Sequence, residues 1–352
     1  MLLIELLRCA AEQPAANAAE RLLVATIRAS DREFQWLLDS GFGPLLNFRL
    51  QSLLHRVSRT RQDMLRAADL VAQVQYGDVA DTVTQVIDVA TKIGTQVTLL
   101  KGISISEQYY AKPHFRRMSD IDVLVPKAAY AVIESELLRQ GFVRGGQLVD
   151  DDHNHGVPLL NAVNGTWVEL HTGLVPASSE LRNGRPFRAI DVSANTICGN
   201  AFGRQIGRLS NELQIVYISC TWNFDMTMRR YHPSFVAGVF DGMVLLSANR
   251  NQINWSFIFD GIDNEMAAAS LLILLSFLKR HEAPLSIPPL DALAKRQQLV
   301  GPVQLRAIHW ALDRYLLAGK KWSAPVPPPV AGRYGIRRQF RKRIVRRSIT
   351  PR

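Results

Sequence analysis

The pattern of apolar and polar positions divides the chain into a helical beginning, a mixed middle and a helical second half. In residues 1–93, apolar side chains recur at the spacing of three and four residues that is typical of amphipathic helices. The pattern predicts helices over Leu2–Leu7, Ala19–Ile27, Phe34–Leu38, Leu45–Leu54, Leu65–Val74 and Asp81–Ile93. Ser30 and Asp31 supply an N-cap before one of them, and Gly94 ends the last.

The period changes after Gly94, where short β-rich runs alternate with helical stretches. The predicted strands cover Gln96–Leu100, Ile121–Val125, Gly156–Leu160 and Thr166–His171. A helix over Ile103–Tyr110 joins the first two, and a helix over Ala128–Gln140, stopped by Gly141, follows the second. The last two flank Asn164-Gly165, a strong hairpin signal. The middle of the chain therefore predicts a small mixed α/β sheet.

Helical periodicity returns at Asn211 and continues almost to residue 317. It predicts helices over Leu213–Asn223, Phe235–Ala248, Trp255–Gly261, Asn264–Lys279, Leu290–Leu299 and Val303–Leu317. The run Pro325–Pro329 indicates a stiff polyproline linker. We expect an α+β fold with an N-terminal helical region (1–93), an α/β core (94–205), a C-terminal helical region (206–322), and a Pro-rich linker with a basic tail (323–352).

The charge changes this picture because it is concentrated in the tail. The 352 residues carry 42 Lys+Arg and 31 Asp+Glu, a formal net charge of +11. Eleven of the cations and none of the acids lie between Lys320 and Arg352, so residues 1–319 carry 31 of each sign. A neutral body argues against binding of nucleic acid through the folded surface. The tail (333–352) suits contact with an anionic membrane or RNA, or a disordered segment.

Other features of composition exclude several classes of protein. Three cysteines far apart in the sequence make neither a disulfide framework nor a zinc spacing, which favours a reducing compartment. We expect the start not to act as a signal peptide, because Glu5 interrupts its apolar run. The longest strongly apolar stretch, Met266–Leu278, is too short to span a bilayer. We therefore expect a cytoplasmic protein, with the tail as its only candidate for membrane contact.

Two carboxylates in a predicted strand are the first candidate for chemistry. Asp120 and Asp122 alternate with apolar residues, so both project to one face and can converge on a hard cation. Such triplets arise by chance, and Glu134-Ser135-Glu136 is one that reads as a solvated helix face. Asp120 and Asp122 differ because their strand should be buried, where an unbalanced carboxylate is costly.

Two further segments could contribute to the same site. The segment Leu99-Leu100-Lys101-Gly102 leads from a predicted strand into a predicted helix. Such a turn can offer backbone N–H groups to a phosphate, and Lys101 and Ser104 could add side-chain contacts. The alternative is an ordinary turn without a binding role. Glu169 and His171 share a face of the last predicted strand, where Glu169 could be a third carboxylate or an edge residue without a role. His153 and His155 follow three aspartates, and we favour a solvated loop over a second metal site there.

Together these segments resemble the polymerase-β-like nucleotidyltransferases, and within them the group described as uncharacterised nucleotidyltransferases. The resemblance rests on LLKG at 99–102, QYYAKPHFRRMSDIDVLV at 108–125, HNHGVPL at 153–159 and VELHTGL at 168–174. Asn211–Trp222, the helix around Asp241 and Ile253-Asn254-Trp255 resemble the group's helical second half. One departure from the superfamily is shared with the group: Lys101-Gly102 stands where a Gly-Ser pair is usual, and Ser104 is displaced by two residues.

The resemblance implies transfer of a nucleoside monophosphate from an NTP to an acceptor hydroxyl. Asp120, Asp122 and Glu169 would be the catalytic residues and would hold Mg²⁺, two ions in all. The nucleotide would lie against Lys101, Gly102, Ser104, Arg116, Arg117, Ser119 and His171. The acceptor would be a small molecule, sugar or peptide in a biosynthetic pathway, with no sequence-specific nucleic acid.

Two other readings remain open at this stage. A non-catalytic accessory protein could keep the same fold and bind a nucleotide or substrate without transferring it. A toxin–antitoxin module that adenylylates a protein partner is the other, although such modules are usually shorter and lack long helical flanks.

Overall fold

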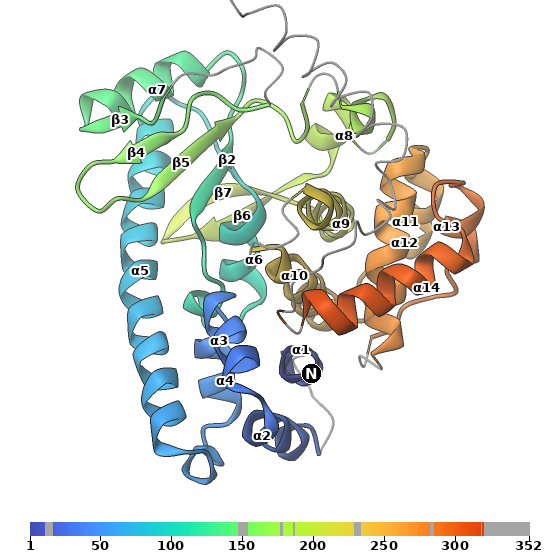
Figure 1. Ribbon diagram of the computed structural model, residues 1–352. Helices are drawn as coiled ribbons and strands as arrows, with labels where there is room; N and C mark the ends of the chain where they lie inside the picture. Colours follow the sequence, from blue (N-terminus) through green and yellow to red (C-terminus); the bar gives the residue numbers. More distant parts are fainter. Residues whose placement is uncertain are drawn as a thin grey trace, which may run out of the picture.

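A computed structural model describes residues 1–10, 17–146, 154–176, 179–185, 187–228, 234–281, 285–317 and 319 (Figure 1). The proline-rich linker and basic tail expected over 323–352 lie outside the described residues, as does His153. In the described part of the chain, none of the helices has both the length and the apolar character needed to cross a membrane.

Seven strands form one mixed sheet in the order β3-β4-β5-β2-β1-β7-β6. They are β1 (Thr98–Leu99), β2 (Asp120–Leu124), β3 (Phe142–Arg144), β4 (Leu159–Asn161), β5 (Trp167–His171), β6 (Thr196–Ala201) and β7 (Arg204–Leu209). β2 is parallel to β5 and antiparallel to β1, while β1 is parallel to β7. The mixed sheet with helices before and after it confirms the expected α+β class.

Four of the strands follow from the sequence pattern and three do not. β1, β2 and the β4–β5 hairpin form where they were predicted, with Gly165 at φ +76° in the hairpin turn. β3, β6 and β7 were missed. Their short segments lack alternation of apolar and polar residues, and the β6–β7 turn is marked only by Phe202 and Gly203, both at positive φ. β7 continues to Leu209, past residue 205 where we expected the α/β core to end.

The N-terminal helices agree with the predicted pattern, with one merger. They are α1 (Leu2–Ala10), α2 (Ala18–Arg28), α3 (Asp31–Asp39), α4 (Gly43–Arg49), a 3-10 turn (Leu54–Arg56) and α5 (Arg59–Lys92). Ser30 caps α3 as predicted, its hydroxyl accepting from the backbone N–H of Glu33 at 3.3 Å. α5 is one helix of 34 residues, whereas the apolar pattern indicated two segments. Between them, over residues 75–80, Val79 is the buried apolar side chain and Gln75 and Gly77 are exposed, so the apolar period is too sparse there to show that the helix continues.

Helices also connect the strands and complete the chain. Those around the sheet are α6 (Lys101–Tyr109), α7 (Tyr130–Arg139), α8 (Ala189–Ala194) and 3-10 turns at Pro113–Phe115 and Glu180–Asn183. The C-terminal ones are α9 (Asn211–Met228), α10 (Ser234–Ala248), α11 (Trp255–Gly261), α12 (Glu265–Arg280), α13 (Asp291–Lys295) and α14 (Pro302–Ala311), which continues as a π-helical turn, Leu312–Leu316. The predicted helix over Leu290–Leu299 therefore shortens to α13.

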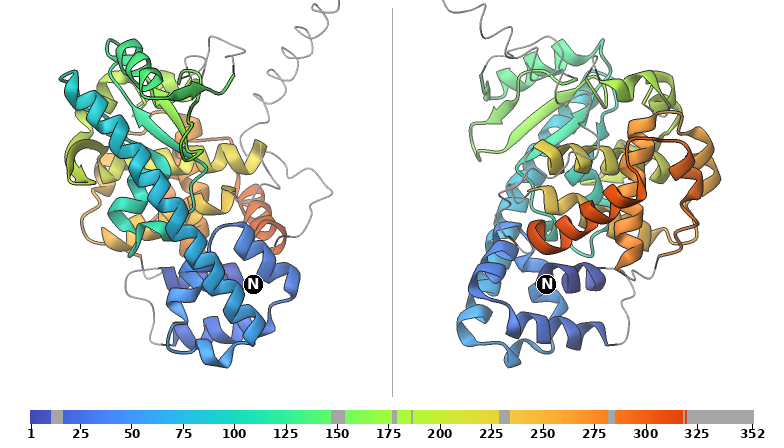
Figure 2. Two further views of the ribbon diagram at one scale, coloured as in Figure 1. Left: turned by 90° about the vertical axis from the view of Figure 1, so that its left-hand side faces the viewer. Right: turned by 45° about the vertical axis from the view of Figure 1, so that its right-hand side comes forward.

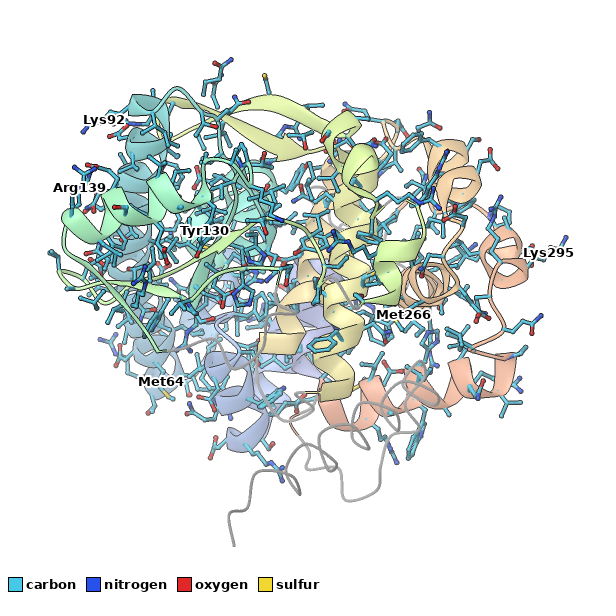
Figure 3. All side chains as sticks on the ribbon, turned by 90° about the horizontal axis from the view of Figure 1, so that it is seen from above. Met64, Lys92, Tyr130, Arg139, Met266 and Lys295 are labelled. Atoms are coloured by element: carbon cyan, nitrogen blue, oxygen red, sulfur yellow. The ribbon has the colours of Figure 1, made fainter. Side chains whose placement is uncertain are left out.

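The two faces of the sheet pack differently. One face, with Ile121 and Val168, forms a hydrophobic core with α5 and α7, to which Val83 and Ile133 contribute. Figure 3 shows these helices, marked by Lys92 and Arg139, on the side away from the C-terminal helices. The opposite face, with the carboxylates of β2 and β5, is turned toward the larger helical core.

Helices from the two ends of the chain share that larger core. Leu6 of α1, Phe42 before α4 and Phe240 of α10 belong to one buried cluster, and the rings of Phe42 and Phe240 stack at 3.9 Å between centroids. The N-terminal and C-terminal regions are therefore packed on each other, although they are far apart in sequence. The boundaries proposed for the four regions stay a prediction.

A buried histidine stands between α12 and α14. His309 is 6% exposed, and its Nε2 lies 3.0 Å from Oγ of Ser276. Burial, assisted by the positive charge of Arg280, lowers the pKa of His309 to about 4. The ring is therefore neutral in the folded protein over a range in which an unfolded chain, with a histidine pKa of about 6.5, takes up a proton.

This difference predicts a loss of stability in acid. Above about pH 6.5, His309 is neutral in both states and does not change the free energy of unfolding. Between about pH 6.5 and 4, the unfolded state holds one more proton than the folded state. The free energy of unfolding therefore falls, as the pH is lowered, by up to about 1.4 kcal/mol per pH unit. In urea titrations from pH 7.5 to 5, His309→Gln should show a shallower pH dependence than wild type. His55→Gln, at an exposed histidine, should follow wild type. Equal slopes for all three proteins would contradict the assignment.

Candidate active site

The parallel pairing of β2 and β5 creates the candidate site. Its register places Asp122 beside Glu169, with Asp120 two residues earlier on β2 and His171 two residues later on β5. Because alternate residues of a strand share a face, all four side chains leave the sheet on the same side. The residues between them, Ile121 on β2 and Leu170 on β5, belong to the core on the opposite face.

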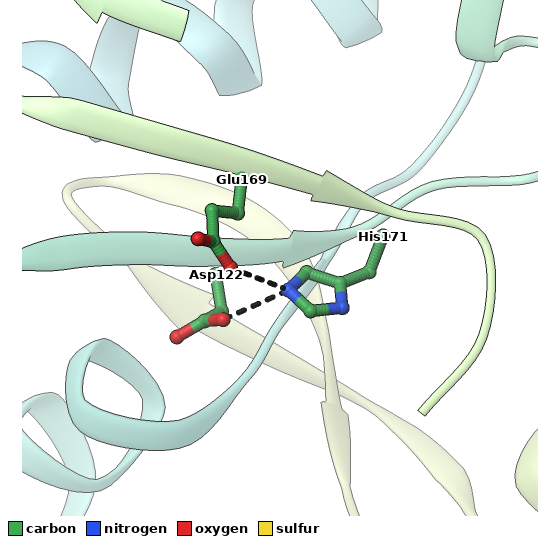
Figure 4. Close-up of side chains that lie close together, drawn as sticks. All are labelled: Asp122, Glu169 and His171. Atoms are coloured by element: carbon green, nitrogen blue, oxygen red, sulfur yellow. Dashed lines mark hydrogen bonds and ion pairs between the residues drawn. The ribbon is translucent and has the colours of Figure 1, made fainter. Parts of the chain in front are cut away.

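Asp122 is the centre of this group. Its carboxylate is buried, and its Oδ1 accepts from Lys101 Nζ at 2.5 Å. The same oxygen faces His171 Nε2 at 2.8 Å (Figure 4). Burial alone would raise the pKa of Asp122, but Lys101 and His171 outweigh it and hold the pKa well below the ordinary range. Asp122 is therefore ionised, and two neighbours stabilise its charge.

Lys101 reaches Asp122 from an unusual backbone conformation. It is the first residue of α6, just after β1, and its φ of +46° lies in the left-handed region that costs a non-glycine residue about 1 kcal/mol or more. The following Gly102 is also constrained, since a Cβ there would lie 3.0 Å from Cγ of Met118. The turn is therefore tightly packed, and it directs the Lys101 ammonium to Asp122.

Glu169 and two histidines extend the group along β5. His171 Nε2 lies 3.5 Å from Glu169 Oε2, and His155 Nε2 lies 3.9 Å from the same oxygen. Burial is the largest single influence on Glu169 and raises its pKa, but the contact with His171 and the positive charges of His155 and Lys101 together outweigh it, so the net shift of the pKa is downward. For His171, burial lowers the pKa and the contacts with Asp122 and Glu169 raise it above its usual value.

Asn154 orients the His171 ring through Nδ1, the ring nitrogen that does not face Asp122. Its Nδ2 lies 2.9 Å from His171 Nδ1 and donates to the carbonyl oxygen of Gly173 at 3.0 Å. In the neutral form of the ring, an amide N–H donor at Nδ1 leaves the imidazole proton on Nε2, directed at Asp122. Sequence reasoning did not single out Asn154; its only signal was its place between His153 and His155.

The donor set suits a cation. Asp122, Glu169 and His171 each offer a ligand atom, all within 4.8 Å of one another. Asp120 lies next to this group, accepting from Ser119 Oγ at 3.0 Å. Its pKa is raised, first by burial and then by the negative charge of Asp122, with a further contribution from Glu169. The carboxylates of this group thus carry more negative charge than Lys101 balances. A hard divalent ion bound to them would neutralise the excess.

Three of the expected nucleotide contacts have other neighbours. Arg116 makes a bidentate pair with Asp241 on α10, with Nε–Oδ1 at 2.9 Å and Nη2–Oδ2 at 3.0 Å. Ser104 is buried and accepts from Gln108 Nε2 at 2.8 Å. Arg117 is exposed and donates to the carbonyl oxygen of Asp39 at 3.4 Å. The structure thus brings Lys101 and His171 to the carboxylates, but directs these three side chains elsewhere.

Tyr217 of α9 is a neighbour that the sequence analysis missed. It is buried on the side of the sheet that carries the carboxylates. Burial raises its pKa strongly, and Lys101, Asp122 and Glu169 also act on the phenol, which places it beside the site. An apolar helical period was its only sequence signal, and that period predicts a core residue.

Comparison with known proteins agrees with this geometry. The model of a family described as "Uncharacterised nucleotidyltransferase" matches residues 31–280, which include every strand and the whole candidate site. The chain belongs to this family, as its motifs suggested. No curated protein matches it.

The Arg116–Asp241 pair gives a test of what holds the site together. Both side chains are largely buried, and Tyr110 also donates to Asp241 Oδ1 at 3.0 Å. Asp241→Asn should lower the free energy of unfolding by about 3 kcal/mol, because it leaves a buried guanidinium without its counter-charge. Chemical denaturation measures this loss.

A surface pair provides the matched control. Asp88 binds Arg204 at 2.7 Å, and both side chains are about 40% exposed. Asp88→Asn should cost less than about 1 kcal/mol. Losses of similar size in the two variants would show that Arg116 and Asp241 do not form a structural link.

Proposed function

We propose that the protein is a Mg²⁺-dependent nucleotidyltransferase that moves a nucleoside monophosphate from an NTP to a hydroxyl of a small molecule, sugar or peptide. The observation that carries the proposal is the register of β2 and β5, which sets Asp122 beside Glu169 and within reach of Lys101 in a chain of this family. Asp120 adds a third carboxylate on the same face.

Asp120, Asp122 and Glu169 would hold the metal, as two ions in the proposal. Oxygen donors of this kind are those that Mg²⁺ prefers. When bound, the ions would neutralise charge on the attacking and leaving oxygens. His171 is the nitrogen neighbour in this set, and its Nε2–H is suited to hold Asp122 in position.

The chain's own groups account for binding and proton movement. Lys101 lies at the start of α6, where its ammonium and the helix N-terminal N–H groups can meet a triphosphate. In the transfer, the acceptor oxygen bonds to the α-phosphorus, the bond to the bridging oxygen breaks, and pyrophosphate leaves. Glu169 is ionised and is placed to favour loss of the acceptor's proton. Asp122 and His171 are buried, which limits the access of water to these two side chains.

The charge distribution limits the acceptor. With 31 charges of each sign over residues 1–319, the body lacks the basic surface that nucleic acid requires. We therefore favour an acceptor that is a small molecule, sugar or peptide over a polynucleotide, in a biosynthetic pathway and in the cytoplasm.

A non-catalytic accessory role is the second candidate, and one contact favours it. Asp122 Oδ1 is already matched by Lys101 and His171, so its charge is stabilised without a metal. A protein that only binds a nucleotide or substrate could keep such a site.

Transfer of label from NTPs carrying ³²P at the α-phosphate tests the proposal. With Mg²⁺ and a pool of small molecules, sugars and peptides as acceptors, wild type should release pyrophosphate and label a product, and EDTA should abolish both. Asp122→Asn should lower the rate by about 10³-fold or more, since it removes the central ionised group. Asp88→Asn, at the surface pair, should retain full activity.

Two results would separate the candidates. Full activity in Asp122→Asn would disprove the proposed site. Binding of NTP to wild type, with no pyrophosphate released for any NTP or acceptor, would favour the accessory role.

A further inference from the structure

The outer side of α5 carries an apolar surface in the middle of the helix. In the left view of Figure 2, α5 runs across the front of the molecule. Leu70 is 64% exposed and Val74 is 63% exposed. With exposed Ala67 and Gly77 they form a line spaced by three, four and three residues, which we call the α5 stripe (Ala67, Leu70, Val74 and Gly77). This spacing is that of a seam between two packed helices.

Gly77 is a second indication that another helix packs on this face of α5. A glycine within a helix costs about 1 kcal/mol relative to alanine. Here it lies inside a helix of 34 residues, its φ is not positive, and a Cβ would meet nothing within 4 Å. Nothing in the described fold therefore requires a glycine at this position. A missing side chain on an exposed helix face allows a second backbone to come close.

The stripe is complementary to itself. If two copies of α5 pack antiparallel about residue 72, Leu70 lies opposite the partner's Val74 and Ala67 lies opposite the partner's Gly77. Large side chains then face large ones and small face small, and the same contacts occur twice, as a two-fold interface requires. A second copy of the chain thus fits the stripe without any other partner.

The charges at the ends of the stripe fit the same arrangement. Before it, Asp63 is paired with Arg59 at 3.2 Å and with Arg66 at 3.4 Å, which leaves an excess of one positive charge. After it, the exposed Asp81 makes no ion pair within the described residues. With the two helices antiparallel about residue 72, Asp81 lies opposite the partner's Asp63, so it meets the cluster of Arg59, Asp63 and Arg66 and its one excess positive charge at both ends of the stripe.

The β4–β5 turn widens the surface on one flank. Val163 in that turn is 89% exposed, and the turn is fixed to α5 because Asn164 Nδ2 donates to the carbonyl oxygen of Asp78 at 2.9 Å. Val71, 53% exposed, flanks the stripe as well. Both add apolar area beside a partner helix.

We propose that the α5 stripe is the interface of a homodimer in which two α5 helices pack antiparallel. From Asp63 to Asp81 the seam spans about 27 Å at 1.5 Å per residue. A seam of one helix pair buries less than the ~1,200 Å² of a standard stable interface, so we expect a weak dimer in the micromolar range.

Sedimentation equilibrium of the full chain between about 1 and 100 μM tests the proposal. The mass should rise with concentration toward twice the 39.4-kDa chain. Leu70→Glu and Gly77→Leu should each shift the association constant down by at least about tenfold, since the first buries a charge and the second separates the backbones. Val132→Glu, at a 51% exposed valine on α7, is the matched control and should dimerise like wild type.

A charge exchange tests the antiparallel arrangement. Arg66→Glu should weaken association, and the double variant Arg66→Glu/Asp81→Arg should restore it. A monomer at every concentration overturns the proposal and leaves the stripe to a different partner. A dimer that is indifferent to Leu70→Glu also overturns it, and a double variant that fails to recover overturns the antiparallel arrangement.

Discussion

The carboxylate of Asp122 is a charge in the interior of a sheet, and the rest of the site depends on balancing it. A buried carboxylate is stable only with a counter-charge or hydrogen-bond donors. Here Lys101 and His171 both reach its Oδ1, from the first residue of α6 and from the neighbouring strand β5. Each partner is constrained in turn, Lys101 by its left-handed backbone and His171 by Asn154. In the proposed function, these groups would exchange the present contacts for a metal and a triphosphate.

Helices from both ends of the chain hold this charged face in place. The sheet packs one face on α5 and α7 through apolar residues, which leaves the other face to carry polar groups. That face is closed by α9, which contributes Tyr217, and the segment before β2 is tied to α10 through Arg116 and Asp241. Because Phe42 stacks on Phe240, the N-terminal helices support α10 from behind. The site therefore relies on contacts between parts of the chain that are remote in sequence.

The sequence predicted the elements with strong periodicity and the residues whose chemistry depends on local spacing. β2 and β5 were found because apolar residues alternate with acids there, and that alternation placed Asp120 with Asp122 and Glu169 with His171. β6 and β7 were not predicted because apolar and polar residues do not alternate along them. The pairing of Arg116 with Asp241 could not be predicted, because the two residues lie 125 positions apart and no local pattern indicates such a pair. Asn154 and Tyr217 were missed for the same reason, since only the fold brings them to the site.

The most direct measurement is a crystal structure of the full chain with Mg²⁺ and a non-hydrolysable NTP analogue. We predict metal ions held by Asp120, Asp122 and Glu169, with the triphosphate against Lys101 and the first turn of α6. A triphosphate bound elsewhere, with Asp122 still paired only to Lys101 and His171, would contradict it.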